Sequence, residues 1–341
     1  NESFIASKDN NKLMTIFIHN GVKYYFIKTR KWNRLFLAAD EQECIYRQAL
    51  EIINSCSIDI LVGWGNLLLE ESIFIMARNR GIKLCFYLVN PTYKNKEFFL
   101  RKYSDLVITD SYSTRDLYKD EIDCRFEVLP KFIQKPENVF TLREVNTKPY
   151  KCLFVNPTIH KGLEAFLKIA HNSERKNLNL EFKCIDINNN LRINLSILNL
   201  SSFKLPSNIK IGSAINNTNE LFEGIHFLLL PSLWHESGSR LIYEAYSRGI
   251  PVIAFSSGGT KEFMKYNPDD LFPLPETYLD VHKILRIKKW DPHLMLARFQ
   301  ELINDKMYYD NYSKEILSIF SNLDLDKQCT DKLNKLILNL T

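Results

Sequence analysis

Residues 231–262 read PSLWHESGSRLIYEAYSRGIPVIAFSSGGTKE, and this stretch decides how the chain is interpreted. An apolar, strand-like run at 225–231 leads into it, and a helical pattern follows over 239–248. Ser237, Gly238 and Ser239 stand at the start of this helix, where small side chains let a ligand approach the backbone. The first amides of a helix lack partners and carry the positive end of its dipole, so the stretch predicts an anion site.

Two carboxylates flank this predicted anion site. Glu236 stands just before it, and Glu244 lies about five residues into the helix, roughly 7–8 Å along its axis. Carboxylates accept paired hydrogen bonds from hydroxyl groups, which is how proteins commonly hold sugars. One sugar on each side of a diphosphate describes a nucleotide sugar, with Glu236 toward the hexose and Glu244 toward the ribose. The alternative is an ordinary strand, loop and helix in which Glu244 lies on the solvent face.

Short apolar runs alternate with helical patterns along the rest of the chain, which is typical of parallel sheets covered by helices. Strands are predicted at 3–6, 14–18, 23–27, 59–64, 83–89, 105–110, 125–130, 151–156, 180–186, 209–212, 225–231 and 251–256. Helices are predicted near 41–55, 68–80, 95–103, 113–119, 161–172, 190–198, 218–223, 239–248, 260–265, 294–304, 306–321 and 324–339.

A composition break divides this alternation into two domains. Pro130, Pro136 and Pro149 lie in a polar stretch in which apolar residues follow neither the helical nor the strand period. We therefore predict an N-terminal domain over 1–135, a linker over 136–150 and a C-terminal domain with closing helices over 151–341. The expected fold class is α/β, with two Rossmann-like parallel-sheet domains facing across a cleft. Ligands of such sheets bind beyond the carboxyl ends of the strands.

Charge and cysteine usage narrow the class of protein. The net charge of +5 comes from 45 basic and 40 acidic residues spread along the chain. So mild a surplus argues against a nucleic-acid partner and is compatible with peripheral contact with a membrane. The seven cysteines are dispersed without a CxxC pair, which indicates reduced thiols. No apolar run reaches the roughly 18 residues of a membrane span. We expect a cytoplasmic protein, with the inner face of the membrane as a further location.

The pieces of the opening stretch stand in the order of a known signature. The stretch resembles the donor site of family 4 retaining glycosyltransferases of the GT-B fold, which has these elements: Pro231-Ser232, Glu236-x7-Glu244-Ala245, Gly249-x-Pro251-Val252 and Gly258-Gly259-x-x-Glu262. The segment CLFVNPTIHKGLEAFLKIA (152–170) is similar to the first strand, loop and helix of that family's C-terminal domain. Lys161 and Gly162 match its Lys-Gly pair. Taken alone, Lys161 reads as a solvated lysine; beside a diphosphate, an ammonium neutralises leaving-group charge.

The resemblance implies a retaining, metal-independent hexosyltransferase. It would move a hexose-type sugar from a UDP-, GDP- or ADP-sugar to a glycan or lipid-linked acceptor in cell-surface polysaccharide assembly, without a cofactor. Lys161 and Glu236 are the catalytic candidates: Lys161, with Arg240, would stabilise the leaving diphosphate, and Glu236 would orient the sugar. The predicted contacts to the nucleotide sugar are Glu244, Ser237, Gly238, Ser239, Arg240, Leu241, Gly162, Gly258 and Gly259.

The N-terminal half departs from the family pattern. The chain begins at what resembles the second strand, so this domain is expected to lack its first strand and helix. Trp64 stands near a position that is often His, and Asn90 stands where a His follows the strand. The Asn side chain can form hydrogen bonds with a sugar, but unlike His it does not titrate near neutral pH. Trp64 and Asn90 remain the acceptor-side candidates.

These departures keep two alternatives open. One is a degenerate GT-B module that binds nucleotide sugar or a protein partner without turnover. The other is a different GT-B enzyme, such as a sugar-nucleotide epimerase, which shares the rhythm of the fold but not the two glutamate motifs.

Overall fold

The computed structural model describes residues 14–31, 33–91, 103–129, 131–133, 136 and 149–340. The elements of the first half are β1 (Met14–His19), β2 (Val22–Ile27), α1 (Ala39–Ser55), β3 (Ile60–Gly63), α2 (Leu68–Arg78), β4 (Lys83–Leu88), β5 (Leu106–Thr109), α3 (Tyr112–Tyr118) and β6 (Arg125–Val128). Those of the second half begin with β7 (Tyr150–Val155), α4 (Leu163–Arg175), β8 (Leu180–Ile185), α5 (Leu191–Ile197), β9 (Ile209–Gly212), α6 (Thr218–Phe222) and β10 (Phe227–Leu230).

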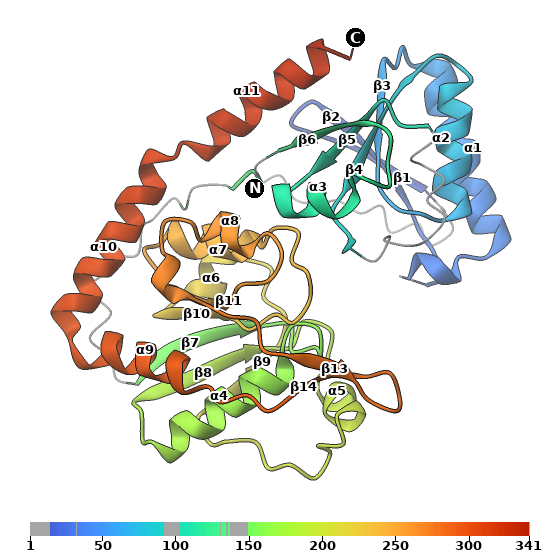
Figure 1. Cartoon of the computed structure of the whole chain (residues 1–341). Helices are drawn as coiled ribbons and strands as arrows, with labels where there is room; N and C mark the ends of the chain where they lie inside the picture. The colour runs from blue at the N-terminus through green and yellow to red at the C-terminus, as the bar shows by residue number, and fades with distance from the viewer. Residues whose placement is uncertain are drawn as a thin grey trace.

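The remaining elements are α7 (Arg240–Tyr246), β11 (Val252–Phe255), α8 (Thr260–Phe263), β12 (Leu271–Phe272), β13 (Thr277–Leu279), β14 (Leu285–Ile287), α9 (His293–Asn304), α10 (Lys306–Asn322) and α11 (Leu325–Leu338). The chain builds two parallel sheets, one in each half (Figure 1). The first has the order β3-β4-β5-β6 and the second β12-β11-β10-β7-β8-β9. The predicted α/β fold of two parallel-sheet units is confirmed.

The inner strands β10 and β11 of the second sheet are buried on both faces because helices cover both. On one face α4 packs Phe166 against Phe154 of β7, with ring centroids 4.3 Å apart. On the other face α7 and α8 bring Tyr243 and Phe263 together, with centroids 4.7 Å apart. A strand covered on both faces reads as a continuous apolar run, as FLLL in β10 does. This is why the sequence predicted these strands so directly.

Some elements differ from the sequence prediction. The three short strands β12, β13 and β14 were not predicted, because two or three residues are too few to show a period. The predicted strand 3–6 and helix 95–103 lie outside the described residues. The predicted linker also lies mostly outside them, so the domain boundary stays a prediction. Among the described residues, no helix combines the length and apolarity that crossing a bilayer requires.

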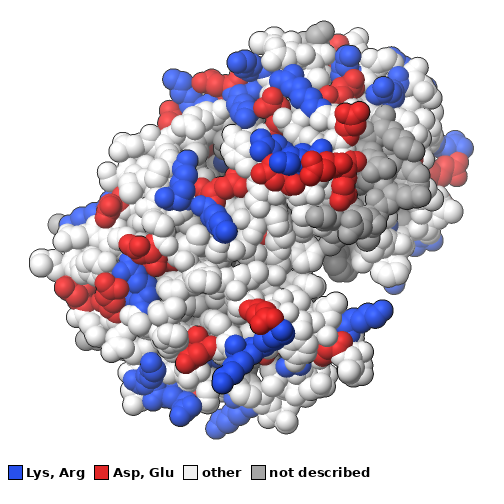
Figure 2. All heavy atoms as spheres, in the orientation of Figure 1, with Lys and Arg blue, Asp and Glu red and all other residues white. Residues whose placement is uncertain are grey.

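The closing helix returns to the first half of the molecule (Figure 1). Leu336 of α11 is buried in a cluster with Cys85, Leu106 and Ile108, which belong to β4 and β5. Nζ of Lys332 in α11 lies 3.5 Å from Oε2 of Glu127 in β6. The helix assigned by sequence to the second domain therefore packs on the first sheet. Charges of both signs are interspersed over the face drawn in Figure 2.

Candidate functional site

The order of the second sheet brings two predicted site loops together. β10 pairs in parallel with β7, with Phe227 opposite Cys152 and Leu228 opposite Leu153. The loop after β7 carries Lys161, and the loop after β10 carries Glu236. The connection from β7 leads to β8 on one side, whereas β10 lies on its other side. Loops at such a change of direction leave a crevice at the carboxyl ends of the strands, which is where open α/β sheets bind ligands.

Lys161 and Glu236 meet directly. Lys161 Nζ lies 2.6 Å from Glu236 Oε1, although the residues are 75 positions apart. Ser232 Oγ donates to the same carboxylate oxygen. The lysine side chain is 36% exposed and the glutamate side chain 12%, so the ammonium is the more accessible member of the pair. The structure therefore contradicts the interpretation of Lys161 as merely solvated.

Gly162 lets these loops approach so closely. Its φ is +82°, a left-handed conformation that favours glycine. A Cβ at this position would lie 1.8 Å from the carbonyl oxygen of Pro231, so no other residue fits without movement of the loop. Gly258 serves the neighbouring loop, where a Cβ would lie 2.4 Å from the carbonyl oxygen of Glu236. Both predicted donor glycines thus contribute first to the packing of the loops around Glu236.

Glu244 is buried, which excludes the solvent-face alternative. Arg240 donates from Nε and Nη2 to Glu244 Oε1, at 2.9 and 2.7 Å. Arg248 donates to the backbone carbonyl of Glu244 and holds this turn of α7 in place. Ser239 is the N-cap of α7 and makes no side-chain cap hydrogen bond. Leu241 packs, partly buried, against the core rather than into the loop region.

Three other predicted donor contacts lie against the first domain. Ser237 Oγ donates to Asp110 Oδ2 at 3.1 Å. A Cβ on Gly238 would lie 2.5 Å from Phe263 Cζ of α8 and 3.1 Å from Asp110 Cβ. A Cβ on Gly259 would lie 2.7 Å from Ser111 Oγ. The small residues of these loops therefore admit the neighbouring domain as well as leaving the backbone accessible.

Sequence reasoning missed two carboxylates at this contact. Asp110 follows β5 and has a fully buried side chain. Glu262, although part of the quoted Gly-Gly-x-x-Glu pattern, had no assigned role; it accepts from the backbone amides of Tyr112 and Ser113 at 2.8 and 2.6 Å. Asp110 could have been found by its place directly after a buried strand, because strand ends collect functional side chains.

The phenol of Tyr87 donates to Asp110 Oδ1. Burial, reinforced by the charge of Asp110, raises the pKa of Tyr87 well above its ordinary value. The phenol is therefore protonated at neutral pH and remains a donor to the carboxylate.

The acceptor-side candidates lie at the same edge of the first sheet. Trp64 follows β3, and Asn90 follows the paired strand β4. The Trp64 side chain is largely exposed, with the Arg34 guanidinium 4.3 Å from its ring centroid. Asn90 accepts a hydrogen bond at its backbone carbonyl from Tyr118. Both residues thus follow the carboxyl ends of neighbouring parallel strands, and their role toward an acceptor stays a prediction.

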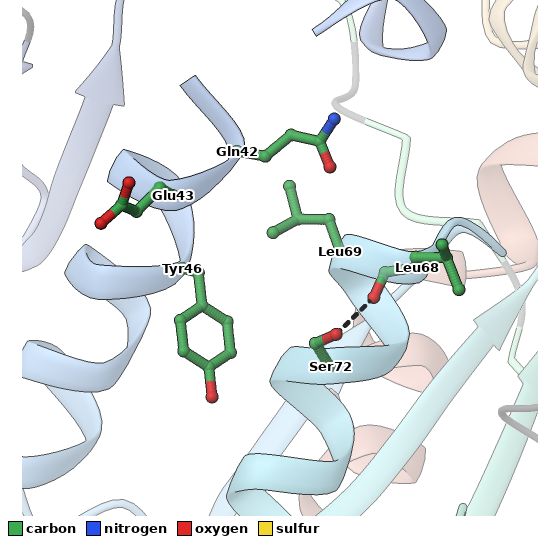
Figure 3. A pocket seen from close by; sticks show the side chains of 6 residues that line it. All are labelled: Gln42, Glu43, Tyr46, Leu68, Leu69 and Ser72. Carbon is green, nitrogen blue, oxygen red and sulfur yellow. Dashed lines mark hydrogen bonds between the residues drawn. The ribbon is translucent and has the colours of Figure 1, made fainter. Parts of the chain in front are cut away.

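A separate hollow of about 360 Å³ lies between α1 and α2 (Figure 3). Leu69 projects into it from α2 and Tyr46 from α1. Three of its polar side chains have partners close by in sequence: Glu43 pairs with Arg47, Ser72 donates to the carbonyl of Leu68, and Gln42 donates to the carbonyl of Leu37. Within the described ranges, no group of three or more His, Cys, Asp or Glu side chains is arranged to hold a metal ion.

Comparison with known proteins gives a likeness in structure alone. No family model matches the sequence, and no curated protein matches it. Among solved structures, Anabaena HepE in complex with UDP-glucose aligns with a TM-score of 0.63 at 14% identity, covering 86% of this chain and 82% of HepE.

Two further solved structures align over most of this chain. TarM of S. aureus, as a point mutant in complex with fondaparinux, alpha-GlcNAc-glycerol and UDP, aligns with a TM-score of 0.62 at 12% identity, covering 88% of this chain and 58% of TarM. WaaG, a glycosyltransferase involved in lipopolysaccharide biosynthesis, aligns with a TM-score of 0.60 at 12% identity, covering 89% of this chain and 84% of WaaG. The chain therefore has the two-domain GT-B fold of these glycosyltransferases.

Proposed function

We propose that this chain is a retaining glycosyltransferase. It transfers a hexose-type sugar from a nucleotide-diphosphate sugar to a glycan or lipid-linked acceptor in cell-surface polysaccharide assembly. The observation that carries the proposal is the 2.6 Å contact of Lys161 Nζ with Glu236 Oε1, between the loops that follow β7 and β10, with Glu244 buried in the helix α7 that comes next.

Lys161 and the two glutamates supply different chemistry. Lys161 is a cation that reaches an anionic ligand from the end of β7, and it stabilises charge that develops on a departing diphosphate. Glu236 holds that ammonium and offers acceptor oxygens to sugar hydroxyls. Glu244 offers the same to a ribose once Arg240 shares or releases it, and Arg240 then adds positive charge near the phosphates. HepE with UDP-glucose and TarM with UDP support uridine nucleotides as the first donors to test.

Ligand-induced stabilisation tests donor binding. The melting temperature is recorded with UDP-, GDP- and ADP-sugars; a ligand at a hundredfold excess over its dissociation constant stabilises the fold by about 2.7 kcal/mol. Lys161→Ala should abolish the shift. The control is Lys168→Ala on α4, whose side chain is equally exposed and pairs with Glu164 at 3.2 Å. Each unliganded variant leaves a carboxylate that is only 12–13% exposed without its ammonium, so we expect both to lose a similar amount of stability, about 1–3 kcal/mol.

Either of two results would contradict the donor site. In the first, no nucleotide sugar raises the melting temperature of the wild type. In the second, a nucleotide sugar raises the melting temperature of Lys161→Ala as much as that of Lys168→Ala. Turnover is then followed as nucleotide release with candidate acceptors. NMR of the product anomer tests retention, and the same assay with EDTA tests metal independence.

A second candidate is a module that binds nucleotide sugar without turnover. Asn90 favours it, because an amide stands where the resembled family has a titratable imidazole. Donor-dependent stabilisation without nucleotide release, across glycan and lipid-linked acceptors, would support this module over the enzyme.

A further inference from the structure

The carboxylate of Asp110 collects contacts from three separate segments of the chain. Tyr87 of β4 donates to Oδ1. Lys131, which follows β6, has Nζ 2.9 Å from Oδ2, and Ser237 of the second domain donates to Oδ2 at 3.1 Å. The side chain of Asp110 is 0% exposed, whereas that of Lys131 is 21% exposed.

Such burial is costly unless the charge is compensated. Removing a carboxylate from water is unfavourable, and a paired cation together with further hydrogen bonds offsets this cost. Tyr87 and Lys131 supply both from the side of the first sheet. The remaining bond goes to Ser237, so this buried charge is directed at the loop that carries the donor site.

A reciprocal contact lies beside it. Glu262, which follows the glycine pair in the second domain, accepts from the amides of Tyr112 and Ser113 at the start of α3. Each domain thus presents a carboxylate to donors of the other. Two independent contacts of this kind fix the orientation of the loops as well as their distance.

The contacts lead directly to Glu236. Ser237 is its neighbour in the chain, and the amide of Gly259 donates to the carbonyl oxygen of Glu236 at 2.6 Å. Gly259 in turn lies against Ser111 of the first domain. The backbone carbonyl of Glu236 and the residue that follows it are therefore held by residues that contact the first domain.

We infer that Asp110 is a positioning residue, which holds residues 234–239 so that Glu236 faces Lys161 and the donor. The inference rests on the proposed function for the nature of the ligand. The donor site is complete only when the first domain is docked through Asp110 and Glu262. Separation of the domains would release Ser237 and loosen the loop, so donor binding and domain docking favour each other.

Amide hydrogen exchange of residues 234–241 in the unliganded full chain tests this directly. Asp110→Ala and Ser237→Ala should each speed exchange there by about tenfold, the effect of losing about one hydrogen bond. The double variant should exchange no faster than Asp110→Ala, because Ser237→Ala removes a contact that Asp110→Ala has already removed. Affinity for the nucleotide sugar that binds wild type should fall by about tenfold in each.

Asp270→Ala is the matched control. Its carboxylate is likewise 0% exposed and paired with a cation, Arg298, at 2.7 Å, but its partners Arg298 and Tyr312 lie in the closing helices. It should leave exchange at 234–241 near wild type. If Asp110→Ala does not fold, the test rests on Ser237→Ala. This variant leaves the Asp110 carboxylate paired with Tyr87 and Lys131, so the buried charge stays compensated.

The outcomes separate the two proposals. Faster exchange at 234–241 in a protein that binds no nucleotide sugar supports the positioning contact and overturns the proposed function. Unchanged exchange and affinity in Ser237→Ala, when wild type binds donor, overturn the positioning role alone. Additive effects in the double variant overturn it as well.

Discussion

At the scale of the residue, the site depends on positions where chemistry and geometry are both demanding. Lys161 and Glu236 were predicted from a motif, and the structure adds that they form one ion pair. Gly162, directly after the lysine, determines whether this pair can form. Its left-handed φ and the absence of a Cβ allow the loop after β7 to lie on the carbonyl of Pro231.

Gly162→Ala should therefore cost far more stability than a left-handed glycine elsewhere. Gly81 has a similar φ of +76°, but a Cβ there would meet nothing within 4 Å. We expect Gly81→Ala to lower the free energy of unfolding by about 1 kcal/mol from backbone strain alone, and Gly162→Ala by about 2–4 kcal/mol because a clash is added. Urea unfolding followed by circular dichroism measures both. Equal losses would show that the Pro231 contact relaxes without cost.

At the scale of the element, burial explains which predictions succeeded. The helix predicted over 41–55 is α1, Ala39–Ser55, and the apolar run 225–231 contains β10, Phe227–Leu230. The helix expected over 239–248 is shorter, Arg240–Tyr246, and ends before Gly249, whose φ is +67°. Helix α11 was predicted as an element, but the apolar stripe in its sequence does not indicate which sheet the helix packs against.

Leu336→Ala should weaken the attachment of α11 to the first sheet. Leu336 is buried among Cys85, Leu106 and Ile108, so its truncation should destabilise the chain by about 2–4 kcal/mol. Leu338 on the same helix is 76% exposed, and Leu338→Ala should change stability by no more than about 0.5 kcal/mol. Urea unfolding, with hydrogen exchange of residues 325–338, measures the two effects. Protection of α11 in Leu336→Ala equal to wild type would contradict this attachment.

At the scale of the whole molecule, the burial of the cysteine side chains reflects how the two halves are packed. Cys56 is exposed, Cys44 and Cys124 are half-buried, and Cys85, Cys152, Cys184 and Cys329 are buried. Burial raises the pKa of Cys85 and of Cys184 to about 12. A higher thiol pKa leaves less of the reactive thiolate at a given pH.

A thiol reagent at pH 8 should therefore label Cys56 rapidly and the four buried cysteines only after denaturation. With a pKa of about 12, roughly one in ten thousand of the Cys85 and Cys184 thiols is ionised at pH 8, before shielding is counted. Mass spectrometry of the labelled native chain assigns the sites. Rapid native labelling of Cys152, at the centre of the second sheet, would contradict the packing described here.

The sequence by itself determined the alternating elements, the two parallel sheets and the residue types of the loops that follow β7 and β10. Apolar runs and helical periods are local patterns, and Glu236, Glu244 and Lys161 stand out because motifs are read along the chain. Contacts between segments distant in sequence carry no such local signal. The pairing of Lys161 with Glu236, the return of α11 to the first sheet and the burial of Asp110 against Ser237 were decided only by the tertiary structure. Each joins groups at least 75 residues apart, and only packing of the sheets brings such groups within hydrogen-bond or van der Waals distance.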